Sequence, residues 1–413
     1  MRIVVLVKVV PDPAGPRRLD PATGWLDRSD GGVVDVVDER ALELALRLTD
    51  ARADTEVVAL AMGPAEIDGA LRRILVRGVD RVVHVRDDAL AGADALLTAH
   101  ALAAALRRER ADLVIAGTAS TDGGGGVVPA MIAELLDLPM LGSVDGVEIG
   151  DGAARATRVT PAYTAVLSAP LPALVSITER VPLASPPAPA RAGGDPRRVD
   201  VLDAAGLGVD LAARTGSRVL SVERAPVRDV ASDDADAARP ALGARLEGEA
   251  VALVFVETKP GGALAATAGE LVSAASAIGT PLPVSVEGGP SARAAALAAA
   301  ARSYEASAVV LAHSASGREA AGRLAARLGA AVVLDVVGLE RTEGRIVATH
   351  SVLGGAYVTT STGPAPLVVT VREGAFDAAP VSGLRALPTP ADARADATVE
   401  SLTPAAAREA QRT

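Results

Sequence analysis

Short apolar runs rich in valine and isoleucine alternate along the chain with longer amphipathic segments, and this alternation limits the possible folds most strongly. The first four apolar runs cover residues 3–7, 55–62, 81–85 and 112–116. Segments with helical periodicity cover residues 38–49, 65–76, 94–108 and 128–136, and further strands are expected within residues 155–167 and 173–177. Strands that alternate with helices in this way form a parallel sheet covered by helices on both faces. The sequence therefore predicts an α/β fold.

The order of these segments occurs a second time in the chain. Residues 308–318 parallel residues 112–122, and each stretch is followed by a helix, an apolar strand and a Gly-x-Glu step. The offset between the two copies is about 195 residues, far longer than the repeat of a solenoid protein. We therefore expect two related Rossmann-like domains with mainly parallel sheets.

Changes in composition indicate where these domains begin and end. Residues 182–196 are rich in proline, alanine and glycine, and residues 229–239 are acidic and alanine-rich without an apolar period. Both features are typical of loops and linkers rather than of a core. The expected division is a first domain over residues 1–202, a linker or extended arm over 203–248, a second domain over 249–378 and a tail over 379–413.

Charge and cysteine content exclude several classes of function. The 413-residue sequence has no cysteine, which excludes disulfides, thiolate catalysis and cysteine-ligated metals and fits a cytoplasmic location. Its net charge of −10 argues against general nucleic-acid binding, and no apolar run approaches the roughly 20 residues of a membrane helix. The four histidines show no metal-ligand spacing, and Ser120 and Ser316 have no evident His–Asp partner. We therefore expect no metal site, no catalytic residue and no membrane insertion.

A glycine-rich loop after the fourth apolar run is the main candidate for a binding site. Residues 123–126 are four successive glycines, whose N–H groups can form a concave nest for the phosphate of an adenine nucleotide. The N-terminus of the next helix would add partial positive charge. Asp122 would hold a ribose hydroxyl or fix the loop, and Lys8 either faces a phosphate or is solvated. A flexible surface connection explains the glycines equally well, because this is neither a Walker loop nor a G-x-G-x-x-G motif.

Several segments of the chain together resemble the electron transfer flavoproteins. The first half is similar to the β subunit through residues 4–12, 38–43, 62–64, 78–85, 117–139 and 171–180. Ser120-Thr121-Asp122-Gly123 followed by residues 128–134 is the most specific of these matches. The second half is similar to the N-terminal domain of the α subunit through residues 254–257, 315–319, 323–329, 352–357 and 369–376. The resemblance covers most of residues 1–376.

The resemblance implies a site for AMP in the β-like half. The residues that match the family's AMP site by position are Leu6, Asp35, Val36, Val37, Asp38, Met62, Asp122, Gly123, Gly124, Gly125, Gly126, Val127 and Val128. Leu6 and Met62 match by backbone position alone. The phosphate nest argued from the glycines and the AMP site implied by the resemblance therefore coincide. The fold implied for both halves is the adenine-nucleotide-hydrolase-like variant of the Rossmann fold.

The resemblance also implies a role in electron transport. Electron transfer flavoproteins carry electrons on FAD from dehydrogenases to a quinone-reducing partner. The glycine–arginine–glycine loop of the family's FAD-binding domain would follow residue 376 and is not found before Thr413, so a separate FAD-domain polypeptide is expected to complete the carrier. Residues 182–198 lack the lysine-rich pattern of the family's docking loop, which leaves the dehydrogenase partner open. The alternative is an AMP-binding regulatory module of the same fold, and a nucleotide-using enzyme has little support.

Overall fold

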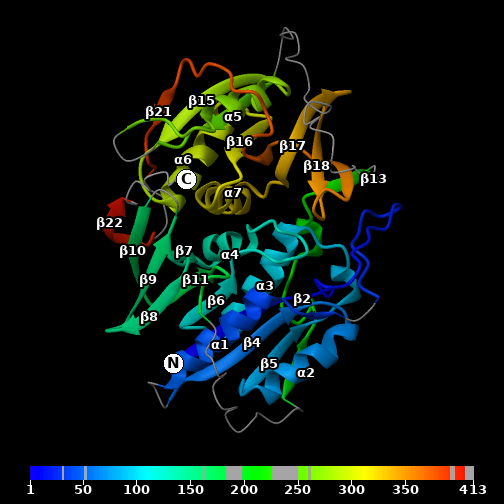
Figure 1. Cartoon of the computed structure of the whole chain (residues 1–413), viewed down its shortest axis with the longest axis vertical. Coiled ribbons are helices and arrows are strands. Elements are labelled where there is room, and N and C mark those ends of the chain that lie inside the picture. The colour runs from blue at the N-terminus through cyan, green and yellow to red at the C-terminus, as the bar shows by residue number, and fades with distance from the viewer. Residues whose placement is uncertain are drawn as a thin grey trace, which may run out of the picture.

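The computed structural model describes residues 1–29, 32–50, 54–160, 163–182, 198–225, 250–258, 262–390 and 396–404. Two large sheets, each with its own helices, follow one another along the long axis of the molecule (Figure 1). The half that contains the N-terminus is drawn in blue to green, and the second half lies above it in yellow to orange. The expected α/β class with mainly parallel sheets is confirmed.

The first half is built on a seven-stranded sheet in the order β12-β5-β4-β1-β6-β11-β7, in which all paired strands are parallel. Its strands are β1 (Arg2–Val7), β4 (Glu56–Met62), β5 (Arg81–Val85), β6 (Leu113–Gly117), β7 (Met140–Val144), β11 (Ala173–Ile177) and β12 (Val199–Leu202). Its helices are α1 (Val36–Asp50), α2 (Asp68–Val76), α3 (Ala95–Glu109) and α4 (Val128–Leu136). The apolar runs form the middle of the sheet because residues of β1, β4 and β6 are buried on both faces.

Smaller elements complete the first half. Two short strands pair with each other, and three 3-10 turns join longer elements: β2 (Val9–Val10), β3 (Val33–Val34), η1 (Ala65–Ile67), η2 (Asp88–Leu90) and η3 (Leu211–Ala213). The stretch 155–167 is divided between two antiparallel strands, because the chain reverses where the Thr160 N–H donates to the Tyr163 carbonyl at 2.8 Å. These strands belong to a four-stranded sheet made of β8 (Gly146–Gly150), β9 (Ala153–Val159), β10 (Tyr163–Pro170) and β22 (Thr398–Pro404).

The second half is built on a nine-stranded sheet in the order β13-β19-β18-β17-β20-β16-β14-β15-β21. Its strands are β13 (Arg218–Arg224), β14 (Val251–Phe255), β15 (Thr280–Val286), β16 (Ala308–Ala312), β17 (Val332–Thr342), β18 (Arg345–Val352), β19 (Tyr357–Thr362), β20 (Leu367–Val371) and β21 (Arg385–Leu387). Its helices are α5 (Ala268–Ser276), α6 (Pro290–Ser303) and α7 (Ala315–Leu328). The central order β15-β14-β16-β20-β17 repeats the order β4-β1-β6-β11-β7 of the first half. The duplication expected from the sequence is therefore present in the strand order.

Segments outside the two expected domains join the sheets at their edges. β13, which falls in the expected linker over residues 203–248, pairs antiparallel with β19 in the second sheet. From the expected tail, β21 pairs with β15 in the second half, whereas β22 pairs with β10 in the first. The arm and the tail thus connect the halves, although the domain boundaries themselves stay predictions. The proline-rich residues 183–197 and the acidic residues 226–249 lie outside the described residues.

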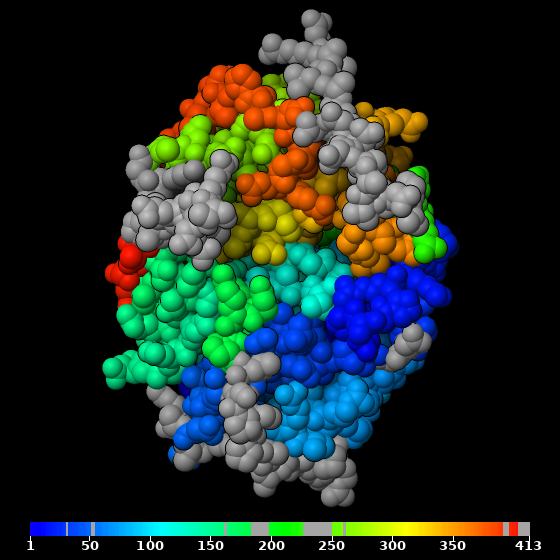
Figure 2. Space-filling model, viewed as in Figure 1, coloured from blue at the N-terminus to red at the C-terminus, as the bar shows by residue number. Residues whose placement is uncertain are grey.

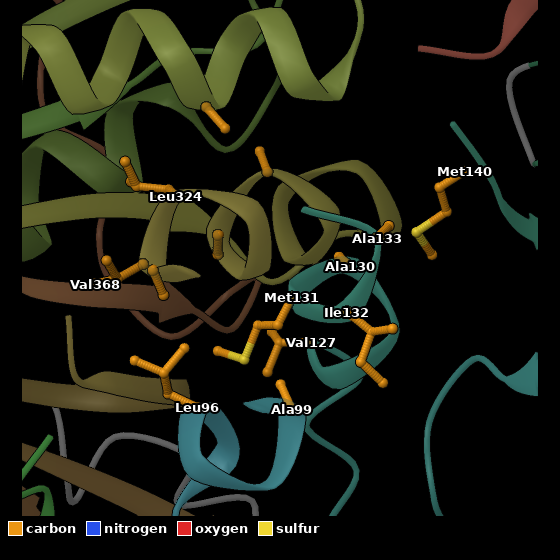
Figure 3. Packing of buried hydrophobic residues seen from close by; sticks show 14 of the residues in the cluster. Leu96, Ala99, Val127, Ala130, Met131, Ile132, Ala133, Met140, Leu324 and Val368 are labelled. Atoms are coloured by element: carbon orange, nitrogen blue, oxygen red, sulfur yellow. The ribbon is translucent and has the colours of Figure 1, made fainter. Parts of the chain in front are cut away.

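The hydrophobic core continues across the boundary between the halves. One cluster of buried side chains contains Met131 and Val127 of the first half together with Leu324 and Val368 of the second. Figure 3 shows the side chain of Met131 of α4 pointing toward Leu96 of α3. In Figure 2 the blue surface of the N-terminal segment also meets the orange surface of the second half. No helix within the described part of the chain is long and apolar enough to span a membrane.

A buried ion pair also joins the halves where α4 packs against α7. The Arg323 guanidinium of α7 is fully buried and lies 3.1 Å from the Glu134 carboxylate of α4. Arg327, one helical turn further along α7, lies 2.6 Å from the other oxygen of Glu134. Breaking a buried pair of this kind leaves an uncompensated charge in the interior. The two halves are therefore held in a specific register rather than by apolar contact alone.

Candidate functional site

A cavity of about 890 Å³ opens at the carboxyl ends of the strands in the first half. Ligands of open α/β sheets bind at this end of the strands. The predicted site residues that line the cavity are Leu6, Asp38, Met62, Gly123, Gly125, Gly126, Val127 and Val128. The predicted residues that are not among its lining are Asp35, Val36, Val37, Asp122 and Gly124. The fold therefore brings the strand ends and the glycine loop together around one cavity.

The glycine loop has a backbone conformation that residues with a side chain could adopt only under strain. Gly124 and Gly126 have positive φ angles of 63° and 64°. A Cβ atom on Gly126 would lie 3.1 Å from the Thr118 carbonyl oxygen and 2.8 Å from the Arg318 guanidinium. α4 follows at once, with Val127 at its N-cap and no side chain capping its first turn. Since the first N–H groups of a helix have no partner within the helix, they remain available to an anion in the cavity.

Asp35 fixes the start of the glycine loop through hydrogen bonds. This side chain is buried, and one of its oxygens accepts hydrogen bonds from the N–H and the hydroxyl of Thr121, at 2.7 and 2.8 Å. Its other oxygen accepts the N–H of Val37 at 3.1 Å, in the first turn of α1. Asp35 therefore links α1 to the loop, whereas Val36 is exposed and Val37 is buried in the core. None of these three residues lines the cavity, and Asp35 positions the loop through its hydrogen bonds to Thr121.

Asp122 forms an ion cluster with two cations at the rim of the site. Its side chain is only 2 % exposed, and Lys8 Nζ lies 2.7 Å from one carboxylate oxygen while Arg28 pairs with the other. Burial alone would raise the pKa of Asp122, but the charge of Lys8 and the hydrogen bonds from Lys8, Ser120 and Arg28 hold it well below its usual range. Of the two roles that the sequence left open, the geometry favours fixing the loop. Lys8 is likewise not simply solvated.

Asp38 lies beneath the end of β6. Its carboxylate is buried and accepts the N–H of Lys8 at 2.8 Å. Burial, assisted by the neighbouring charge of Asp35, raises the pKa of Asp38 to about 7. A Cβ on Gly117 would lie 2.7 Å from the Asp38 oxygen, so the strand can end here only in glycine. Asp38 thus fixes the ends of β1 and β6 at the edge of the cavity.

A protein family matches this chain over most of its length. The family described as "Electron transfer flavoprotein domain" matches residues 23–206 and again residues 241–407. The chain belongs to the electron transfer flavoprotein family. The two matches agree with the two copies of the fold, one in each half, and the resemblance seen in the sequence is confirmed.

Individual relatives include proteins named as β subunits of electron transfer flavoproteins. The electron transfer flavoprotein subunit beta of Mycobacterium leprae is 39% identical over 231 residues, which cover 53% of this chain and 86% of the relative. That of Mycobacterium tuberculosis is 38% identical over 239 residues, or 55% of this chain and 89% of the relative. The caffeyl-CoA reductase-Etf complex subunit CarD of Acetobacterium woodii is 34% identical over 185 residues, covering 44% and 70%.

The chain has further cavity residues that the sequence did not single out for the site. Arg28 joins the ion cluster from a loop far from the glycines in sequence, and Leu334 of the second half lines the cavity. Trp25, the only tryptophan of the chain, also lines it and is 54% exposed, so its fluorescence can report on the cavity. Within the described residues, no group of three or more His, Cys, Asp or Glu residues is placed to hold a metal ion.

Proposed function

We propose that this chain is a β/α-fused electron transfer flavoprotein that binds AMP in its first half and acts as the scaffold of an FAD-based electron carrier. Such a carrier passes electrons from dehydrogenases to a quinone-reducing partner in the cytoplasm. The two family matches support the fusion, and the relatives named as β subunits support the role in electron transfer.

One observation carries the proposal for AMP. The glycine loop and the first turn of α4, which no side chain caps, line the same cavity, so backbone N–H groups of this turn would be available to a phosphate there. The rest of the cavity offers apolar surface from Leu6, Met62 and Ile67. An apolar pocket with a few convergent polar groups is typical of small-molecule sites. AMP combines an aromatic base with a dianionic phosphate. The base would suit the apolar surface of the cavity, and the phosphate would suit its N–H groups.

The proposal assigns FAD mainly to another polypeptide. FAD supplies the redox chemistry when it is bound, and the protein binds and orients it. In the proposal, a separate FAD-domain polypeptide is the partner that completes the carrier, as the resemblance to the family implies. What this chain contributes in the proposal is the joined pair of α/β halves on which that domain docks. Joining the halves in one chain makes their association intramolecular.

A second function rests on the same cavity. An AMP-binding regulatory module would need the first-half site and no flavin partner. The altered residues 182–198, which lack the lysine-rich docking pattern, favour this alternative. Co-purification of a flavin-domain polypeptide with the tagged full chain would support the electron carrier, and its absence from the native host extract would favour the regulatory module.

The small molecules released from the purified full chain test the proposal directly. We expect denaturation to release AMP and no stoichiometric flavin, identified by mass. Flavin bound by this chain alone at one per chain would contradict the scaffold role. Release of no nucleotide, combined with no binding of added AMP, would contradict the AMP site.

A further inference from the structure

A cation from the second half lies against the glycine loop of the first half. Arg318 is in the first turn of α7, the helix that packs against α4. A Cβ on Gly126 would lie 2.8 Å from Arg318 Nη1 and 3.2 Å from its Cζ, so the guanidinium contacts the loop backbone directly. Arg318 is not among the residues that line the cavity. The partly buried Arg318 guanidinium therefore lies on the side of the loop that faces the second half.

The Arg318 guanidinium has no partner of its own among the described residues. Its Nε atom is buried without a hydrogen bond, and burial lowers the pKa of Arg318. The carboxylate that acts on it electrostatically belongs to Asp335, which is already engaged by Arg372 at 3.0 Å. Arginine nevertheless stays protonated in proteins. Arg318 thus carries a partly buried positive charge that has no paired anion among the described residues.

Such a charge is best explained by an anion that binds nearby. Burying an unpaired charge is unfavourable, and the attraction between opposite charges is much stronger inside a protein than in water. The glycine loop that Arg318 touches is also the place where the N–H groups of α4 favour an anion. Gly126 lies between Arg318 and the cavity, and it has no side chain that would screen the charge of Arg318 from an anion bound there.

We infer that Arg318 is a specificity residue of the nucleotide site, contributed by the second half, which favours a nucleotide with a phosphate over the uncharged nucleoside. This inference rests on the proposed AMP site and goes beyond it, because it assigns the second half a part in selecting the ligand. Arg318 would act on the phosphate through the loop rather than by direct contact.

The test compares AMP with adenosine on the full chain after removal of bound nucleotide. We expect Arg318→Met to weaken AMP binding about tenfold, within the usual range of coupling between sites, and to leave adenosine binding unchanged. Arg318→Lys keeps the charge and should retain most of the affinity for AMP. Arg345→Met, at an exposed position on β18, is the matched control and should change neither affinity. Calorimetric titration measures all four proteins.

Three results would overturn the inference. They are an unchanged affinity of Arg318→Met for AMP, a parallel loss of AMP and adenosine binding, and a loss in Arg318→Lys as large as in Arg318→Met. The last two would assign Arg318 a packing role. Failure of the proposed function is separate from these outcomes, because the unmodified chain would then bind neither AMP nor adenosine.

Discussion

The loops that follow β6 and β16 occupy equivalent places in the two halves but are built differently. In the first half, residues 118–127 separate β6 from α4, and no side chain caps the helix. In the second half, α7 begins at Ala315, directly after Ser314, whose hydroxyl accepts the Gly317 N–H at 2.9 Å. The same topological position is thus open to an anion in one half and closed by a serine cap in the other.

The strand next to each loop shows the same contrast in charge. Lys8 directly follows β1 in the first half. Glu257 follows β14 in the second half, and its carboxylate accepts the Ser314 hydroxyl at 3.1 Å. A duplicated fold therefore does not imply a duplicated site. The residues at the strand ends decide whether an anion is attracted or repelled.

The largest expected effect comes from closing the open loop. Gly126→Val places a branched side chain at a positive φ and against both Thr118 and Arg318. We expect AMP affinity to fall about 100-fold, because the loop must move away from its anion-binding shape. Quenching of Trp25 fluorescence by added AMP measures the affinity.

Gly124→Ala is the matched control for this change. Gly124 also has a positive φ, but a Cβ there would meet open space. The control should therefore show the backbone strain without the clash and lose much less affinity. Equal losses in the two variants would contradict the geometry described for Gly126.

The free energy of unfolding is expected to fall by about 2 kcal/mol between pH 5 and pH 7 because of Asp38, which lies under the open site. Burial raises its pKa from 3.8 to about 7, so the folded state keeps a proton that the unfolded chain has lost. The contribution to stability is complete below about pH 4, falls as the pH rises and is lost above about pH 7. Urea unfolding between pH 5 and pH 7 should show the decline in the unmodified chain. A decline of the same size in Asp38→Asn would assign it to other groups.

A smaller loss of affinity is expected when the cation at the strand end is removed. Lys8→Met should weaken AMP binding about tenfold, because one charge near the loop is lost while Arg28 still pairs with Asp122. Glu257→Gln changes the equivalent position of the second half and should leave AMP binding as it is. Fluorescence titration of both variants gives the comparison, and a loss in Glu257→Gln would contradict the assignment of the site to the first half.

The smallest effect concerns the cap of the closed loop. Ser314→Ala removes the side chain that caps α7 and should lower the free energy of unfolding by about 1 kcal/mol. AMP affinity should not change, since the cap is not part of the first-half cavity. Thermal unfolding measures the loss of stability, and a weaker binding of AMP would show that the two loops are coupled.

Much of the fold was predictable because it rests on local patterns. The β-branched runs and helical periods gave β1, β4, β6 and α4 nearly at their observed bounds, and the glycines marked the loop. β13 and β22 were not predicted, since they are exposed edge strands without a hydrophobic period.

The contacts of the site were less predictable than its location. Arg28 and Arg318 reach the loop from distant parts of the chain, and nothing local distinguishes them from other surface arginines. The roles of Asp35 and Asp122 also depend on partners brought close by the fold. A partial signal was present for Arg318, because residues 315–319 align with the loop region of the first half when the two copies of the repeat are compared.

The number of AMP molecules bound per chain tests the central claim most directly. Calorimetric titration of the nucleotide-free full chain should give one site, because the two halves share a fold but only the first has an open loop. Gly126→Val should remove that site. Two sites per chain, or a single site that survives Gly126→Val unchanged, would contradict the account.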